Sequence, residues 1–286
     1  MLEVKKLTQD ELNYIPALCL DPSVGKEGKG IMAKAMDRRI EWITEMMNRG
    51  LELFVALENP RDEIINYKWA GMIKHSDLAI SGKVPMGLLE CIPIEHALEP
   101  IVGKDSLFIN CMWILPPFWK KGVGDALIKA FIERARQIGS GSVLSYENES
   151  WFDTTIEYMP MSFFKKYGFI ETDRDGKRIL LFLDFNGGTP PNFLPLNLNN
   201  ELNDQALTLN LFCNDQCPWS TYMVKEIREG IKLYQSIDIN IISTTKKRLI
   251  EKFGISRGVT LNNRPLFKSM ITWDHVKKEI DKLNLT

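Results

Sequence analysis

The residues from Phe118 to Gly124 combine charge and glycine in a way that suits a phosphate ligand. They read FWKKGVG, with two lysines and two glycines, and an amphipathic run that predicts a helix follows directly. Glycine lets the main chain come close to a ligand, and free amides at the positive end of a helix attract anions. The sequence therefore predicts a binding loop for a diphosphate.

The elements on either side must hold this loop in place. Leu107 to Leu115 is almost free of charge and rich in large apolar side chains, which favours a central strand covered on both faces. Pro116 and Pro117 end the pairing because neither can donate a main-chain hydrogen bond. Apolar residues then recur at helical spacing and predict one buried helix face, at Val123, Leu127, Ala130, Phe131, Ala135 and Ile138.

Spacing separates this loop from two common nucleotide-binding loops. No GxxxxGK[ST] run is present, and the GxGxxG pattern fails because Leu127 stands where the third glycine belongs. The segment instead resembles motif A of the GNAT superfamily of acyl-CoA N-acyltransferases, whose loop commonly reads V-x-P-x-[YF]-[RQ]-x-[KR]-G-x-G. Trp119 departs from this pattern, because the family usually has Arg or Gln there. The residues that match are Ile114, Pro116, Phe118, Lys121, Gly122 and Gly124.

A second segment with the same resemblance follows one strand later. Gly141 to Tyr146 predicts that strand, and Met161 to Ile170 resembles the family's A-x-x-F-Y-[EK]-[KR]-x-G-F segment. Gly168 is expected to end the intervening helix. A turn at 173–176 and a last apolar run at 179–185 come next. Two motifs in the right order make the resemblance much stronger than either motif alone.

The resemblance implies which residues hold the co-substrate, acetyl-CoA. The main chain of Met112, Trp113 and Ile114 is expected to pair with the pantetheine arm. Amides of the loop are expected to surround the diphosphate, at Trp119, Lys120, Lys121, Gly122, Val123 and Gly124. An amine then attacks the thioester directly, while the enzyme accepts a proton from the ammonium and stabilises an oxyanion.

The proton-transfer groups are less sharply indicated, because Phe164 stands where the family often has a tyrosine. Tyr158 is the preferred proton donor, and donation from water is the competing view. Ser162 and Tyr167 are other nearby hydroxyls, although Tyr167 is expected in the core. Glu149 is the first choice for the proton acceptor. Two further carboxylates follow the same strand, at Glu147 and Glu157, and a solvated loop position is the ordinary alternative for all three.

The sequence before the motif is compatible with the same α/β (α+β) fold, a mixed central sheet with flanking helices. Strands are expected at 2–7, 51–57 and 68–75, and an amphipathic helix at 36–49 ends at Gly50. The stretch from Asp77 to Lys104 contains Pro85, Pro93 and Pro100. It is interpreted as an irregular insertion near the acceptor site.

The chain of 286 residues is expected to hold two domains. Gly, Pro and Asn crowd into a stretch without periodicity, which predicts a linker over 187–206 between domains at 1–186 and 207–286. The second domain is expected to follow the order β-α-β-α-β-β-α, with a hairpin turn at Asn262-Asn263 and a last helix capped by Thr272. That order resembles the thioredoxin fold in its small, glutaredoxin-like form, and the whole arrangement resembles the bacterial YoaP-type proteins.

The run Cys217-Pro218-Trp219-Ser220 resembles the C-P-[YW]-[CS] active site of thioredoxin-like proteins. A thiol at the start of a helix meets the helix dipole, which favours the thiolate. Ser220 replaces the second cysteine, which leaves a monothiol or a pairing of Cys217 with Cys213. The proline before the third strand is also missing, at Gly258-Val259-Thr260. A structural or substrate-covering role is favoured over a redox role.

Composition limits the other possibilities. A net charge of -1 offers no reason to expect nucleic acid or an anionic membrane as a partner. The N-terminus lacks a signal-peptide core and no apolar run is long enough to span a bilayer, so a cytoplasmic location is expected. Five cysteines without framework spacing and isolated histidines predict neither disulfides nor a metal site.

Taken together, these features predict an acetyl-CoA-dependent N-acetyltransferase that acts on an amine of a small molecule or peptide. Three alternatives stay open. One is a non-catalytic acyl-CoA-binding regulator, which the Phe164 departure favours. Another is a thiol redox protein that uses Cys217, and the third is recruitment of a protein partner by the last third of the chain. The sequence leaves the oligomeric state open.

Overall fold

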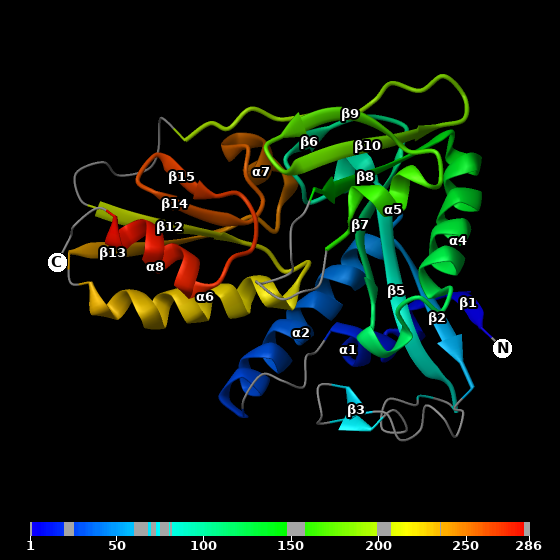
Figure 1. Ribbon diagram of the computed structural model, residues 1–286, viewed down its shortest axis with the longest axis horizontal. Coiled ribbons are helices and arrows are strands. Elements are labelled where there is room, and N and C mark those ends of the chain that lie inside the picture. The colour runs from blue at the N-terminus through cyan, green and yellow to red at the C-terminus, as the bar shows by residue number, and fades with distance from the viewer. Residues whose placement is uncertain are drawn as a thin grey trace.

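The protein is represented by a computed structural model, which describes residues 2–19, 26–59, 68–69, 73–74, 80, 82–147, 158–198, 207–234 and 236–282. Figure 1 shows two sheets side by side, each with its own helices. The larger sheet comes from the first two thirds of the chain. The smaller one comes from the last third.

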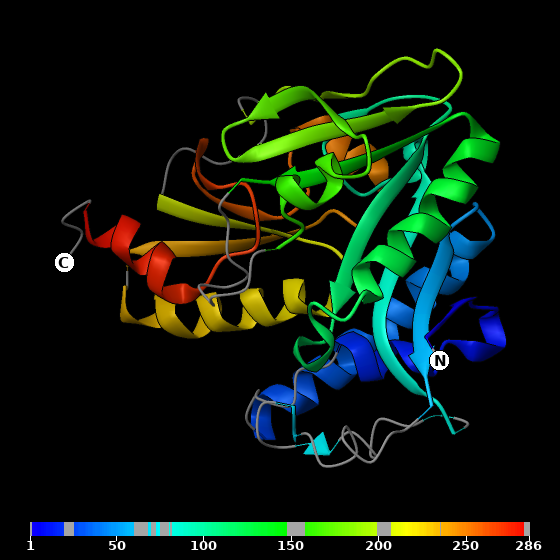
Figure 2. The ribbon, with the colours of Figure 1, turned by 45° about the vertical axis from the view of Figure 1, so that its right-hand side comes forward.

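The larger sheet has seven strands in the order β1-β2-β5-β7-β8-β10-β9. Neighbouring strands are antiparallel except for β7 and β8, which are parallel. Helices α4 and α2 lie on opposite sides of it, α4 in front and α2 behind in Figure 2. The strands are β1 (Glu3–Lys6), β2 (Glu52–Glu58), β5 (Val84–Pro93), β7 (Leu107–Ile114), β8 (Ser140–Tyr146), β9 (Ile170–Asp175) and β10 (Arg178–Asp184). The helices are α1 (Tyr14–Cys19), α2 (Lys26–Met47), α4 (Val123–Ile138) and α5 (Met161–Lys165).

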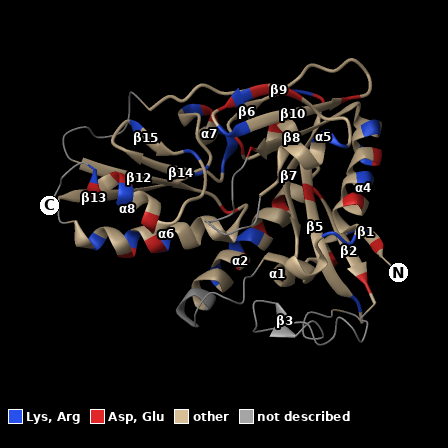
Figure 3. Cartoon of the chain, viewed as in Figure 1, with Lys and Arg blue, Asp and Glu red and all other residues tan. Residues whose placement is uncertain are grey.

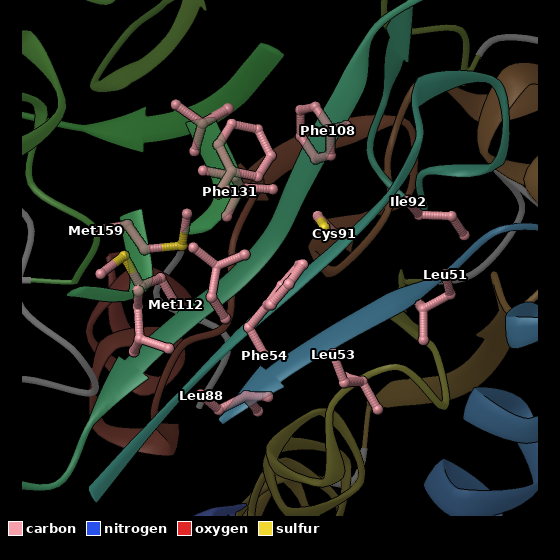
Figure 4. Close-up of a cluster of buried hydrophobic side chains, with 14 of the residues drawn as sticks. Leu51, Leu53, Phe54, Leu88, Cys91, Ile92, Phe108, Met112, Phe131 and Met159 are labelled. Carbon is pink, nitrogen blue, oxygen red and sulfur yellow. The ribbon is translucent and has the colours of Figure 1, made fainter. Parts of the chain in front are cut away.

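The core of this sheet forms because its central strands carry apolar side chains on both faces. Figure 4 shows Phe108 of β7 beside Phe131 of α4, and both rings are fully buried. Gly141 of β8 lets this helix approach closely, because a Cβ there would come within 2.8 Å of the Phe131 ring. Of the predicted buried helix face, Ile138 is 40% exposed, since it is the last residue of α4.

The prediction of an irregular insertion over 77–104 is wrong. Residues 84–93 form β5, a fully central strand between β2 and β7. Pro85 is tolerated because the register with β2 shifts there: Leu57 pairs with Pro85 and Ala56 pairs with Gly87. A bulge of this kind accommodates a residue that cannot donate to the ladder. The prolines therefore concealed a strand whose remaining residues are strongly apolar.

Two other expected elements differ in extent. Helix α2 begins at Lys26, ten residues before the predicted start at Met36 (36 − 26 = 10). The strand expected over 68–75 is described only as a small hairpin of β3 (Lys68–Trp69) and β4 (Ile73–Lys74), and its other residues lie outside the described ranges.

The last third of the chain has the predicted order of elements. The four-stranded sheet has the order β13-β12-β14-β15, with β12 and β13 parallel and the other pairs antiparallel. Asn262 and Asn263 form the predicted turn, with Asn262 at a φ of 48°. The elements are β12 (Leu207–Cys213), α6 (Pro218–Gly230), β13 (Ile237–Ser243), α7 (Lys247–Phe253), β14 (Gly258–Leu261), β15 (Arg264–Phe267) and α8 (Trp273–Asp281).

Polar contacts join the two parts of the molecule. The Lys247 ammonium of α7 donates to the carbonyls of Glu99 and Ile101, at 2.8 Å and 3.0 Å. Arg257 forms a buried ion pair with Glu99. The predicted linker contributes β11 (Asn192–Phe193), which pairs with β6 (Ile101–Val102). Figures 1 and 2 both show the start of α6 against α2.

Charged groups are dispersed over the molecule. Figure 3 shows Lys and Arg interspersed with Asp and Glu along α2, α4 and α6. None of the helices in the described ranges combines the length and the apolar character that a bilayer crossing needs.

Candidate active site

Strands β7 and β8 separate halfway along their length. They pair only where Leu107 to Ile109 faces Gly141 to Val143, although β7 continues to Ile114 and β8 to Tyr146. The separation begins at an extra residue: Glu90 of β5 faces Cys111, and Cys91 faces Ile109, so Asn110 is left without a partner. A bulge of one residue bends its strand. The bend at Asn110 therefore opens a gap between β7 and β8.

The main chain of β7 turns polar groups toward this gap. Leu115 donates its N–H to the Met86 carbonyl of β5 at 2.9 Å. Because an antiparallel ladder alternates, the main-chain groups of Met112 and Ile114 point away from β5 and into the gap. The Ile114 carbonyl accepts a hydrogen bond from the Trp119 indole at 2.8 Å, which agrees with this direction.

The predicted anion loop lies at the open end of the gap. Gly122 has a φ of 79° and Lys120 a φ of 59°, and α4 begins at Val123. The first bond of the helical ladder runs from Ala126 N–H to the Gly122 carbonyl at 3.0 Å. The amides of Val123, Gly124 and Asp125 precede that bond and have no acceptor within the helix. The start of α4 therefore presents unpaired amides at its positive end, as the glycine pattern predicted.

A cavity of about 740 Å³ connects the loop with the gap. Of the predicted coenzyme site, Lys121 and Val123 do not line it: the Lys121 ammonium lies over the Phe118 ring at 5.9 Å, and Val123 is buried in the core. The predicted residues that do line it are Met112, Trp113, Ile114, Trp119, Lys120, Gly122 and Gly124. Phe118, the first residue of the predicted loop, also lines it. Sequence analysis did not assign several other lining residues to this site, among them Asp125, Phe163 and Lys166.

Tyr158, the predicted proton donor, lines the same cavity. Its hydroxyl lies 3.9 Å from the Cys111 sulfur of β7. Burial, with a smaller contribution from Cys111, raises the pKa of Tyr158 well above 10. The competing hydroxyl of Tyr167 instead donates to Asp125, and burial with that bond raises the pKa of Tyr167 to about 12. Phe164 is buried, so it supplies packing at the position where a tyrosine was missing.

The predicted proton acceptor cannot be compared with the structure. Glu149 and Glu157 lie outside the described residues. Glu147 is described and forms an ion pair with Arg174, which occupies its carboxylate.

A buried carboxylate that sequence analysis missed lies next to the bulge. Glu90 of β5 is fully buried and pairs with Arg39 of α2 at 2.9 Å. The side-chain amides of Asn110 and Gln216 donate to the same carboxylate at 3.1 Å and 3.2 Å. A charged residue inside the apolar run of β5 was the available signal. Gln216 comes from the last third of the chain, so no local sequence pattern could reveal its contact with Glu90.

The two cysteines of the predicted redox site have different surroundings. Burial and, to a smaller extent, Asp215 raise the pKa of Cys213 to about 11, against the opposing effect of Arg38. Burial also raises the pKa of Cys217, against the opposing effects of Arg257 and Arg39. The main chain of Trp219 at the start of α6 favours the thiolate, in the direction expected for a helix start. Desolvation of the charged sulfur has the larger effect, so the pKa of Cys217 is raised.

The chain is similar to several known acetyltransferases. Residues 60–169 match the model of the acetyltransferase (GNAT) family. The matched residues include β5, β7, the anion loop and α4.

One curated relative is described as an uncharacterized N-acetyltransferase, YoaP, of Bacillus subtilis (strain 168). It is 24% identical over 160 residues, which is 53% of this chain. The match spans about three fifths of that relative's length, 61%.

Solved structures that resemble this chain include PaiA N-acetyltransferase from Thermoplasma acidophilum in complex with coenzyme A. Its TM-score is 0.41 at 12% identity, over 65% of this chain and 99% of that one. Another is the N-acetyltransferase PseH of Campylobacter jejuni in complex with acetyl coenzyme A, with a TM-score of 0.38 at 14% identity, over 64% of this chain and 99% of that one.

Proposed function

We propose that this protein is an N-acetyltransferase that moves the acetyl group of acetyl-CoA to an amine of a small molecule or peptide. The observation that carries the proposal is the gap between β7 and β8, which opens at Asn110 and leads to a loop of bare amides at the start of α4. A thioester needs a slot between strands for its arm and donors for its diphosphate. Both lie here on one continuous cavity.

In this proposal, main-chain groups make most of the contacts with acetyl-CoA. Met112 and Ile114 pair with the amides of the pantetheine arm as an added strand would. For this to happen, the Trp119 indole must release the Ile114 carbonyl. The diphosphate oxygens accept hydrogen bonds from the amides at the start of α4. The exposed ammonium groups of Lys120 and Lys166 at the cavity add positive charge. No Cβ hinders the phosphates at Gly122, where the space is open.

The transfer itself forms one bond and breaks another. The amine nitrogen attacks the thioester carbon, a C–N bond forms, and the C–S bond breaks as coenzyme A leaves. The amine loses one proton and the departing sulfur gains one. Tyr158 supplies the proton to sulfur, because its raised pKa keeps the phenol protonated. Glu149 is proposed to accept the proton from the amine.

The last third of the chain is proposed to be a thioredoxin-like domain over 207–286, joined by a linker over 187–206 to an acetyltransferase domain over 1–186. Its contacts with Glu90 and Glu99 support a role in covering the acceptor side. The raised pKa values of Cys213 and Cys217 give no support to a thiol redox role, since the thiolate is the reactive form.

The test is turnover of acetyl-CoA with a panel of primary amines. Release of free thiol, together with an acetylated product in the mass spectrum, is the expected result. Calorimetry of acetyl-CoA binding accompanies it. Tight binding without turnover of any amine would favour the non-catalytic regulator, and absence of binding would reject both functions.

A further inference from the structure

Trp119 closes part of the slot that the arm of the coenzyme would occupy. Its indole Nε1–H donates to the Ile114 carbonyl at 2.8 Å. That carbonyl points away from β5 and into the gap between β7 and β8, because the next amide, that of Leu115, bonds to the Met86 carbonyl of β5. The indole therefore uses an acceptor that an added strand would need.

The position of the indole is determined by the short turn that precedes it. Pro116–Phe118 forms a single 3₁₀ turn directly after β7. The Phe118 amide bonds to the Leu115 carbonyl at 2.9 Å, and the Trp119 amide bonds to the Pro116 carbonyl at 3.2 Å. The Phe118 ring is buried and anchors the turn in the core. The turn thus brings the main chain of Trp119 back alongside the end of β7.

The indole itself is held loosely. Within the described residues, the bond to Ile114 is its one hydrogen bond, and no other ring stacks on it. Trp119 is 40% exposed, although it lines the cavity. A single neutral hydrogen bond contributes little net free energy when both groups can turn to water instead. The ring can therefore move outward without disturbing the core.

The indole and the arm cannot use the Ile114 carbonyl together. A carbonyl oxygen has two lone pairs and can accept two hydrogen bonds. Here both donors would have to approach from the gap, because β5 covers the other side of β7. The indole fills the space beside this oxygen, so it blocks the arm sterically as well as by hydrogen bonding.

We propose that Trp119 is an internal competitor of the coenzyme arm: its indole closes the slot in the free protein, and acetyl-CoA binds only after the indole has left the Ile114 carbonyl. The inference rests on the proposed acetyltransferase function. The apparent Kd for acetyl-CoA is then the intrinsic Kd divided by the fraction of molecules whose slot is open. Coenzyme A, the product, carries the same arm, so the indole weakens its binding equally and favours its release.

A matched pair of ligands separates the slot from the phosphate site. The compound 3′-phospho-ADP is the nucleotide part of coenzyme A: it contains the diphosphate and lacks the pantetheine arm. It can occupy the anion loop whether or not the indole closes the slot, whereas acetyl-CoA needs the slot to be open. Only ligands that carry the arm should therefore respond to a change at Trp119.

Calorimetry with the full chain tests the inference. Trp119→Phe keeps an aromatic ring and removes the indole N–H, so the Kd for acetyl-CoA and for coenzyme A should fall about two- to tenfold. The Kd for 3′-phospho-ADP should stay within about twofold. Trp273→Phe is the control and should change none of these constants, because Trp273 packs against Tyr234 in the last third of the chain. An unchanged or higher Kd for acetyl-CoA in Trp119→Phe overturns the inference, as does an equal fall for 3′-phospho-ADP.

Two crystal structures of the wild-type chain give a second test that needs no variant. Without ligand, the indole should donate to the Ile114 carbonyl. In the complex with coenzyme A, the indole should be turned outward and an amide of the pantetheine arm should donate to the same carbonyl. An indole that still bonds to Ile114 while the arm occupies the slot overturns the inference.

Failure of the inference and failure of the proposed function look different. A wild-type protein that binds neither acetyl-CoA nor 3′-phospho-ADP in calorimetry fails as an acetyltransferase. If acetyl-CoA binds the wild type and Trp119→Phe with the same Kd, only the internal competition is rejected, and the acetyltransferase function stands.

Discussion

Tyr158 combines a position in the coenzyme cavity with a pKa raised by burial. Burial penalises the phenolate, so the hydroxyl stays protonated beyond the pH at which a free tyrosine ionises. A proton donor needs this property, because it must keep its proton until the sulfur leaves. We therefore propose that Tyr158, buried beside Cys111, takes the role of the tyrosine that the second motif lacks at Phe164.

Replacement of Tyr158 by Phe tests this role. We expect kcat to fall about a hundredfold or more, with the KM for acetyl-CoA unchanged, because only the proton is removed. Because the pKa of Tyr158 is raised, wild-type kcat should show no loss from this group up to pH 10. Tyr167→Phe is the control, since Tyr167 does not line the cavity itself and its hydroxyl donates to Asp125 at the start of α4. Equal kcat values for Tyr158→Phe and the wild type would assign the proton donation to water.

Arg257 affects Cys217 at the junction of the two parts of the chain. It comes directly before β14, next to the Gly258-Val259-Thr260 stretch that lacks the expected proline, and it forms an ion pair with Glu99 of the larger part. Its charge lowers the pKa of Cys217, but burial has the larger effect. In a thioredoxin-like redox protein, the start of the first helix would expose a reactive sulfur. Here the region around Cys217 is covered by a contact between the two parts of the chain.

At the scale of the elements, local patterns predicted the strand, loop and helix from Leu107 to Ile138 well. The reason is that periodicity, proline and glycine act within a few residues. Strand β5 was missed because two prolines mark its ends, and only the pairing with β2 shows that a bulge admits Pro85. The order of elements in the last third was predicted because each helix and strand there is short and clearly bounded.

The polar cluster around Glu90 was beyond such patterns. Arg39, Glu90, Asn110 and Gln216 come from four separate elements and segments and meet only in the folded chain. The bulge at Asn110 depends on the register between β5 and β7, which no single strand specifies. The predicted base at Glu149 stays a prediction, since it lies outside the described residues.

The anion loop provides a matched pair of glycine variants. Gly122 has a φ of 79° and Gly176 a φ of 63°, and neither has a heavy atom within 4 Å of an added Cβ. Alanine at either site should cost roughly 1–2 kcal/mol of stability, because the left-handed conformation strains any other residue. Only Gly122→Ala should weaken acetyl-CoA binding, by about tenfold or more in calorimetry. Equal loss of binding in Gly176→Ala would show that strain, not the phosphate site, is responsible.

Helix α7 carries a titratable contact at its first residue. Burial lowers the pKa of Lys247 to about 8, below the 10.5 of the unfolded chain. Between these two values the unfolded state binds more protons than the folded state, so the contribution of Lys247 to stability rises with pH from about 8 to 10.5. The free energy of unfolding of the wild type minus that of Lys247→Met should increase over this range in urea titrations. A flat difference would show that Lys247 keeps an ordinary pKa.

At the scale of the whole molecule, the two parts are joined by buried charges as well as by partly exposed ones. The Arg257–Glu99 pair and the Arg39–Glu90–Gln216 cluster both cross between them. Such contacts are costly to break on one side only, because the remaining charge stays buried. The last third of the chain is therefore expected to unfold together with the larger sheet rather than as a separate unit.

Two arginine variants test this coupling. Arg257→Ala leaves Glu99 buried without its partner and should lower the free energy of unfolding by roughly 3–5 kcal/mol. Arg38→Ala removes a half-exposed contact with Asp215 and should cost less than about 1 kcal/mol. Calorimetric melting is the measurement, and a single transition is expected for the wild type. Two separate transitions, with Arg257→Ala affecting only one of them, would contradict the coupling.

The bulge at Asn110 has a consequence for the evolution of such a protein. The open seam in the sheet exists because β7 is one amino acid longer than β5 requires at that point. Loss of a single codon would restore the register, close the seam and leave the apolar interior intact. A catalyst of this design can therefore become an inert scaffold without the replacement of any reactive group.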